Sequence, residues 1–240
     1  MLNQSGGRIK NYELINLPES KNKLNITQYT EFEYYGKMSK INYKDITRFL
    51  DTLGDNKTNT INKVAEHIKK IIIQFMDYYN KNYKKVDSFW LAIRCSNPNN
   101  IFDIPRWHHD GTFFKTKETE RVHKFVITLQ SNSTLYLSDK KLIKKFIEKN
   151  EKLHKKMFKK EIKDFKEQIK YNDKHIRPKL AKLVGKKYNK VPDNKGLIFE
   201  VGSKNAVIHS EPPIEHDRIF ISILPGTFEQ ISNLKKRWGK

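Results

Sequence analysis

Apolar residues recur at helical spacing in the first third of the chain. They do so over residues 43–53 and again over residues 58–83, and this pattern predicts two amphipathic helices packed on a sheet. The stripe of the second helix consists of Ile61, Val64, Ile68, Ile71, Ile72, Phe75, Met76 and Tyr79. Residues 1–40 have no clear period, and we assign residues 1–85 as a whole to an N-terminal helical region.

The pattern changes after Val86, where short apolar runs alternate with residues that favour turns. Residues 88–95 predict a strand, and residues 121–137 predict two strands around the turn SNST. Further strands are predicted at 196–201, 206–209 and 218–224, with a turn at 202–205. These runs place a β-rich core over residues 86–228, and a chain of 240 residues suits one such core.

A lysine-rich block at residues 139–190 interrupts this core. It holds 20 of the 48 Lys and Arg residues and more than half of the net charge of +21. Its apolar stripe predicts a helical insertion whose first helix is capped by Ser138. Two interpretations stay open, because the lysines either form a solvated face produced by AT-rich codon bias or bind nucleic acid by neutralising phosphates. The stripe consists of Leu142, Phe146, Leu153, Met157, Ile162, Phe165 and Ile169.

Cysteine usage and terminal composition indicate the compartment. The single cysteine, Cys95, excludes an intramolecular disulfide and any multi-cysteine metal site, which fits a reducing environment. The N-terminus is polar, and no apolar run approaches the roughly 20 residues of a membrane span. We therefore expect an intracellular protein, cytoplasmic or nuclear, with a virion as a further location and no membrane partner.

The candidate chemistry begins in RWHHDGTFF at residues 106–114. In extended backbone the side chains of His108 and Asp110 leave the same face, while His109 points away. His209, 99 residues after Asp110, ends a predicted strand and offers a second imidazole. Two imidazoles and one carboxylate form the facial triad that holds non-haem Fe(II). Taken singly, each residue is better explained as an ordinary loop or strand-end residue, whereas their joint order favours a metal site.

A basic residue follows this set, since Arg218 opens the apolar strand RIFISIL nine residues after His209. An arginine that enters a sheet interior needs a carboxylate partner, and its planar fork suits the distal carboxylate of a dicarboxylic acid such as 2-oxoglutarate. The alternative is a salt bridge at the rim to Glu215 or Asp217. Phosphate-binding glycine motifs and the serine-hydrolase elbow are absent from the sequence.

With H-x-D, a long gap, a distal histidine and an arginine, the sequence resembles the 2-oxoglutarate and Fe(II)-dependent dioxygenases over roughly residues 86–228. The resemblance implies an α+β fold with a double-stranded β-helix core of the jelly-roll, cupin-like type. It also implies Fe(II) on His108, Asp110 and His209, with 2-oxoglutarate on Arg218. The gap is long, and the insertion accounts for about half of it.

A second departure concerns the cosubstrate contacts. Many members of the family carry a serine two residues after the arginine, where this chain has Phe220 and then Ser222. By strand position, Arg94 and Tyr136 join the expected pocket.

The function implied is that of an oxygenase, a hydroxylase or demethylase, which uses O2 and converts 2-oxoglutarate to succinate. The positive charge favours an anionic substrate, either a nucleic acid or an acidic protein segment, held by residues 139–190. Two alternatives from other classes stay open. One is a non-catalytic, basic nucleic-acid-binding or virion-associated protein on a cupin-like scaffold. The other is a metal-dependent cupin of different chemistry, such as an isomerase, in which Arg218 has no cosubstrate.

Overall fold

The computed structural model describes residues 11–18, 21–115, 120–158, 162, 164–202 and 206–239. The N-terminal elements are β1 (Tyr12–Asn16), β2 (Thr30–Lys37), the 3-10 turn η1 (Met38–Lys40), α1 (Tyr43–Asp51) and α2 (Thr58–Asn82). The middle elements are β3 (Ser88–Ser96), β4 (Val122–Gln130), β5 (Leu135–Tyr136), α3 (Lys140–Phe158), α4 (Phe165–Tyr171), the π-helical turn η2 (Asn172–Ile176) and α5 (Arg177–Val184). The last elements are β6 (Asn189–Lys190), β7 (Lys195–Val201), β8 (His209–Ser210), β9 (Arg218–Gly226) and α6 (Phe228–Trp238).

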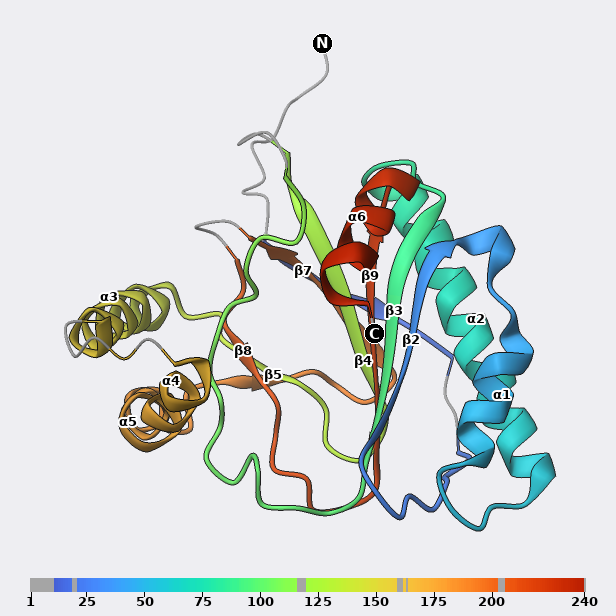
Figure 1. Ribbon diagram of the computed structural model, residues 1–240, viewed down its shortest axis with the longest axis horizontal. Helices are drawn as coiled ribbons and strands as arrows, with labels where there is room; N and C mark the ends of the chain where they lie inside the picture. The colour runs from blue at the N-terminus through green and yellow to red at the C-terminus, as the bar shows by residue number, and fades with distance from the viewer. Residues whose placement is uncertain are drawn as a thin grey trace.

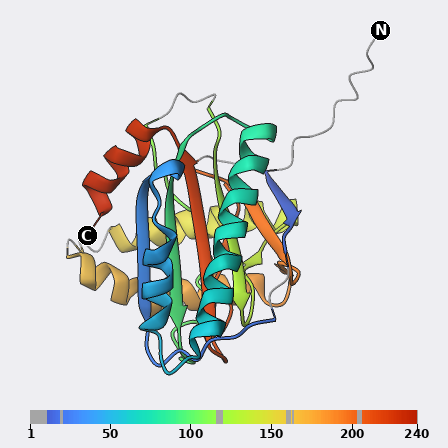
Figure 2. The ribbon, with the colours of Figure 1, turned by 90° about the vertical axis from the view of Figure 1, so that its right-hand side faces the viewer.

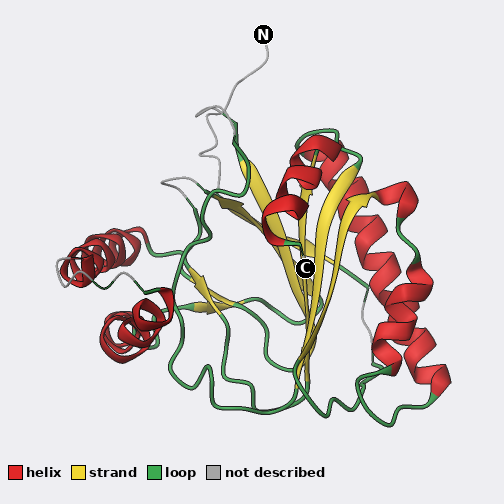
Figure 3. Ribbon diagram, viewed as in Figure 1, coloured by secondary structure: helices red, strands yellow, loops and turns green. Residues whose placement is uncertain are grey.

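The described strands form two antiparallel sheets. The larger sheet has six strands in the order β1-β7-β4-β9-β3-β2, and the smaller has three in the order β6-β5-β8. Figure 3 shows the strands of the larger sheet running side by side, with the smaller sheet between them and one group of helices. The expected mixture of helices and antiparallel strands is therefore confirmed.

One face of the six-stranded sheet is covered by α1 and α2 (Figures 1 and 2). Period-2 alternation sends Ile219, Ile221 and Ile223 of β9 to this face, where they share a core with the predicted stripe of α2. The neighbouring positions of β9, beginning with Arg218 and Phe220, therefore point to the opposite face. That opposite face looks toward the three-stranded sheet and holds the candidate chemistry.

The lysine-rich insertion is an excursion between two paired strands. Leu135 and Tyr136 of β5 pair with Lys190 and Asn189 of β6, so the chain leaves and returns at the same point. Between them, α3, α4 and α5 pack on the outer side of the smaller sheet (Figure 1). The long gap between the H-x-D motif and the distal histidine is thus filled by helices outside the sheets.

Three details of the sequence prediction need correction. The region 1–85 is not wholly helical, because β1 and β2 form both edges of the larger sheet. Edge strands bury little of either face, and β2 is half-buried along most of its length, which explains the missing apolar period. The first insertion helix is capped by Asp139, whose Oδ1 accepts from the Leu142 amide at 2.7 Å, and not by Ser138.

The insertion stripe is also only partly buried. Leu142, Phe146 and Met157 join the core, whereas Phe165 and Ile169 are exposed. Most of the predicted turn at 202–205 lies outside the described residues. None of the described helices is long and apolar enough to cross a bilayer.

Candidate metal centre

Three side chains from distant parts of the chain meet between the two sheets. Potential ligand atoms of His108, Asp110 and His209 all lie within 4.8 Å of one another. Asp110 Oδ1 is 3.6 Å from His108 Nε2 and 3.9 Å from His209 Nε2. We call these three residues the triad. The structure thus brings together the three residues that the sequence singled out.

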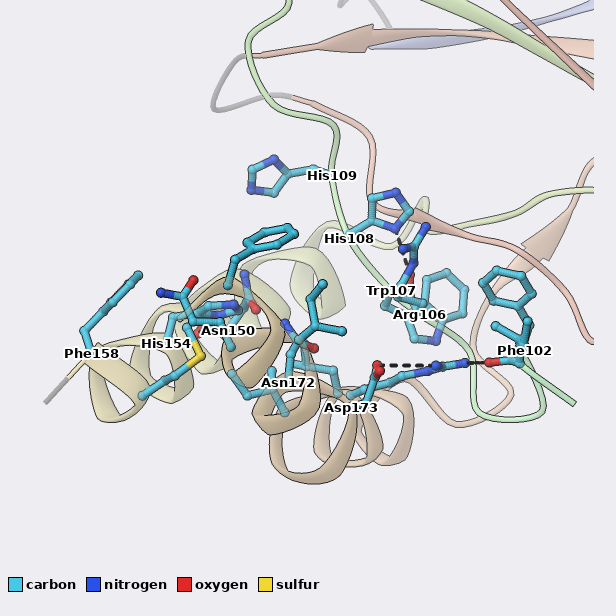
Figure 4. A pocket seen from close by; sticks show the side chains of 18 residues that line it. Phe102, Arg106, Trp107, His108, His109, Asn150, His154, Phe158, Asn172 and Asp173 are labelled. Atoms are coloured by element: carbon cyan, nitrogen blue, oxygen red, sulfur yellow. Dashed lines mark hydrogen bonds and ion pairs between the residues drawn. The ribbon is translucent and has the colours of Figure 1, made fainter. Parts of the chain in front are cut away.

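Backbone pairing fixes the two imidazoles of the triad. The His108 amide donates to the His209 carbonyl at 3.0 Å, and the His209 amide donates back at 2.8 Å. The ring centroids are consequently only 4.4 Å apart. His109 leaves the strand on the other side, as the alternation predicted (Figure 4).

The outer nitrogen of each imidazole is already engaged. His108 Nδ1 lies 2.7 Å from the Arg106 carbonyl, and His209 Nδ1 lies 3.0 Å from the Val207 carbonyl. A carbonyl can only accept, so Nδ1 carries the proton in both rings, and the lone pair of Nε2 is directed toward Asp110. This is the tautomer that a metal-binding histidine requires, and the donor set fits a divalent ion such as Fe(II).

A buried lysine that the sequence analysis missed accompanies Asp110. Lys124 Nζ on β4 lies 2.9 Å from Asp110 Oδ2, and both side chains are nearly buried. Burial alone would raise the pKa of Asp110, but Lys124 and the two imidazoles hold it well below its usual range. Asp110 is therefore a carboxylate at neutral pH, with Oδ2 held by the lysine and Oδ1 left toward the imidazoles.

Burial also sets the protonation state of His209. Its ring packs against that of Phe199, and the two ring centroids are 4.8 Å apart. Burial, with the nearby His108, lowers the pKa of His209 to about 4. The imidazole is neutral at pH 7 and competent as a ligand without first releasing a proton.

Arg218 is buried on the same side of the larger sheet, being only 4% exposed. Its Nε makes a long hydrogen bond of 3.4 Å to the Asn132 carbonyl, and its guanidinium lies 4.8 Å from the centre of the Phe220 ring. Its Nη2 has no hydrogen-bond partner among the described residues. Burial lowers the pKa of Arg218 to about 10. A buried, incompletely paired guanidinium of this kind fits an anionic ligand.

The alternative of a salt bridge at the rim is not realised for Arg218. Asp217 Oδ2 accepts from the Ile26 amide at 3.0 Å, and Glu215 accepts from the Asn132 side chain at 3.4 Å. Arg94, the second candidate anchor, differs because its Nε donates to Glu31 at 2.8 Å. Of the two arginines, only Arg218 retains a buried donor for a ligand.

A buried hydroxyl on the same face as Arg218 was also missed. Thr128 on β4 pairs with Phe220 on β9, two residues from Arg218, and the register shifts just beyond this pair, between Thr128 and Gln130. Thr128 Oγ1 is buried and has no hydrogen-bond partner among the described residues. The detectable pattern is in β4 itself, where Lys124, Val126 and Thr128 alternate with Phe125, Ile127 and Leu129, which face the core beneath α1 and α2.

The remaining predicted pocket residues occupy the same interlayer region. Ser222 is buried on β9, where it pairs with Ala92 and Val126. Tyr136 is buried on β5 directly opposite His209. Its ring centroid lies 5.0 Å from that of Tyr12. Both positions lie in the layer between the sheets.

One further carboxylate lies beside the triad. Glu211 Oε1 accepts from Arg106 Nη2 at 3.0 Å, while Oε2 is buried without a partner among the described residues. Burial alone would raise the pKa of Glu211, but His108 and Arg106 lower it to about 2. The centre therefore contains a second anionic group, two residues after the distal histidine.

Comparisons with known proteins add little to this geometry. No protein-family model matches the chain, and no curated protein is similar to it in sequence. Among solved structures, the chain is similar to a truncated viral collagen prolyl hydroxylase from Paramecium bursaria Chlorella virus-1, at 12% identity and a TM-score of 0.34. The match covers 86% of this chain and 95% of the other. This likeness is too distant to indicate activity, so the functional conclusion depends on the side chains.

Proposed function

We propose that the protein is an Fe(II)- and 2-oxoglutarate-dependent oxygenase on a double-stranded β-helix core. The convergence of the triad carries this proposal, because two imidazoles and one carboxylate from segments 99 residues apart meet within 4.8 Å. Two facing antiparallel sheets support the jelly-roll assignment. A buried arginine on the facing layer, whose Nη2 has no hydrogen-bond partner among the described residues, supports the cosubstrate.

Each residue of the centre has a distinct role in this proposal. The triad binds Fe(II), and the carbonyls of Arg106 and Val207 hold its imidazoles in the required tautomer. Lys124 fixes Asp110 through Oδ2 and leaves Oδ1 as the single ligand atom. Arg218 binds the distal carboxylate of 2-oxoglutarate, assisted by the hydroxyl of Thr128.

The bound iron and 2-oxoglutarate supply the oxidising chemistry, in which the cosubstrate is decarboxylated to succinate while a substrate C–H bond is hydroxylated or an N-methyl group is removed. The protein orients both groups and excludes water. Phe199 and Phe220 contribute apolar walls on the larger sheet, beside His209 and Arg218 respectively. Ser222 and Tyr136 extend the pocket between the layers.

Succinate production is the test. Metal-free protein would be loaded anaerobically with one equivalent of Fe(II), supplied with 2-oxoglutarate and then exposed to O2. We expect succinate from the wild type, a near-complete loss in Asp110→Ala, and retention in His109→Ala. Absence of both Fe(II) binding and succinate from a folded wild-type protein would refute the proposal.

Glu211 supports a second candidate, a metal-dependent cupin of different chemistry. A buried carboxylate beside the triad, together with the positive charge of Arg218, could orient a substrate that carries both donors and acceptors, without a cosubstrate. The two candidates differ in one observable. In the second, the triad binds metal but 2-oxoglutarate does not bind, and Glu211→Gln leaves metal stoichiometry unchanged.

A further inference from the structure

A cavity opens beside the triad, between the insertion helices and the segment 101–109. Its volume is about 630 Å³, within the range of ligand sites. His108 and His109 line one end, and Phe158 on α3 lines the other (Figure 4). A molecule that fills this cavity therefore contacts a residue of the proposed metal centre.

The walls of the cavity are largely apolar and exposed. Phe165 on α4 is 72% exposed, and Phe158 at the end of α3 is 63% exposed. Ile101 and Ile169 add further exposed apolar surface from opposite sides. A contiguous apolar patch rimmed by polar residues is typical of an interaction site, since leaving such surface in water is unfavourable.

Charge distribution distinguishes between the anionic partners considered from the sequence. No lysine is among the described residues that line the cavity, although the insertion is lysine-rich. The two arginines in its wall are engaged, since Arg106 pairs with Glu211 and Arg177 donates to the Ile104 carbonyl at 2.6 Å. Arg177 also donates to the Ile101 carbonyl. Phosphates would find no free lysine or arginine among the described residues that line this cavity.

The lysines lie instead on the outside of the same helices. Lys155 and Lys156 near the end of α3 are exposed, close in sequence to Met157 and Phe158 of the cavity wall. Asn150 and Asn172 line the cavity itself and carry side-chain amides that can pair with a peptide backbone. An apolar cavity that has side-chain amides in its wall and lysines outside it is complementary to an extended polypeptide whose apolar residues are flanked by acidic ones.

We propose that this cavity binds an extended, acidic-flanked apolar segment of a polypeptide substrate and presents it to the triad. The apolar side chains pack on Phe158 and Phe165, and the acidic residues approach the outer lysines. This inference rests on the proposed oxygenase function, because the oxygenase reaction is the only one that we assign to the bound polypeptide. Binding itself requires no turnover, so the two proposals can fail separately.

The test selects binders from two random pools, using immobilised, metal-free, full-length protein at physiological salt. One contains displayed 12-residue peptides, and the other contains 20-nucleotide single-stranded DNA. The double variant Phe165→Asp with Ile169→Asp changes the wall of the cavity and is called the groove variant. Both positions are exposed, so the protein should still fold. The matched control is Phe228→Asp, at an exposed phenylalanine on α6 that does not line the cavity.

We expect enrichment of peptides that combine apolar and acidic residues. Their affinity should fall at least tenfold in the groove variant and stay unchanged in the control. Peptide enrichment that the groove variant does not alter, or no enrichment, would overturn the inference. So would DNA binding that is lost in the groove variant, because nucleic acid would then be the occupant. A wild-type protein that produces no succinate from 2-oxoglutarate in the absence of substrate would instead refute the oxygenase.

Discussion

Replacing Arg218 with methionine should stabilise the ligand-free protein while abolishing its response to 2-oxoglutarate. Burial lowers the pKa of this guanidinium well below its usual value, to about 10. Since each pH unit corresponds to about 1.4 kcal/mol, the charged side chain costs the folded state about 3 kcal/mol at neutral pH. The cost is fully present at pH 7, because the guanidinium is protonated in both the folded and the unfolded states.

Some favourable contacts are lost with the arginine. The cation–π contact with Phe220 is worth about 1 kcal/mol, and the 3.4 Å hydrogen bond to the Asn132 carbonyl no more than about 1 kcal/mol. The net expectation is a gain of about 1 kcal/mol in the free energy of unfolding. For a chain of this length, that gain raises the melting temperature by roughly 2 to 4 °C.

The assay is thermal unfolding with and without saturating 2-oxoglutarate, in the presence of Mn(II) as a redox-inactive metal. The cosubstrate should raise the melting temperature of the wild type but not of Arg218→Met. Arg94→Met is the control, and it should lower stability because it leaves Glu31 without its 2.8 Å partner. A ligand-free Arg218→Met protein that melts several degrees below the wild type would show that Arg218 has a structural partner, and the reasoning would be wrong.

Four further predictions concern the metal centre and the insertion. Alanine at any triad position should abolish stoichiometric Fe(II) binding, measured by metal analysis after desalting, whereas His109→Ala should retain it. Lys124→Met should destabilise the metal-free protein by about 3 kcal/mol, because Asp110 keeps its charge without a partner. Mn(II) should restore more stability to this variant than to the wild type, and Lys124→Arg should behave like the wild type. The unfolding free energy of the metal-free protein should fall as the pH drops from about 6.5 to about 4, because the unfolded chain binds a proton at His209 that the folded state excludes. Chemical denaturation of His209→Ala should show a shallower dependence, and an equal slope would place the titrating group elsewhere. Finally, a fluorescent oligonucleotide should bind weakly with a steep salt dependence, and Lys155→Glu with Lys156→Glu should reduce this binding without affecting iron; no salt-sensitive binding at low ionic strength would make the lysines a merely solvated face.

The candidate ligands could be predicted from the sequence because their arrangement is local. The two-residue period of extended backbone places His108 and Asp110 on one face, and a strand boundary marks His209 and Arg218. Their meeting depends on a single backbone bridge between His108 and His209. The order of these residues along the chain, with the family resemblance, was sufficient to anticipate it.

The surroundings of these ligands could not be predicted in the same way. Whether an arginine has a carboxylate partner depends on which strands are neighbours. Arg94 pairs with Glu31 of β2, a strand that has no apolar period, whereas no ion pair of Arg218 is found among the described residues. Lys124 and Thr128 reach the centre through the register of β4 against β7 and β9. Cross-strand register is a tertiary property, so residues that act through it are not visible in one sequence.

Anaerobic calorimetric titration of 2-oxoglutarate into Fe(II)-loaded protein tests whether the triad and Arg218 bind the cosubstrate together. We expect saturable binding of one 2-oxoglutarate per chain to the wild type, strongly weakened without metal and in Asp110→Ala. In Arg218→Met the affinity should fall at least about 30-fold, corresponding to roughly 2 kcal/mol for removing one partner of a buried charge pair. Binding of equal strength in the wild type, the metal-free protein and Arg218→Met would contradict both the metal centre and its cosubstrate anchor.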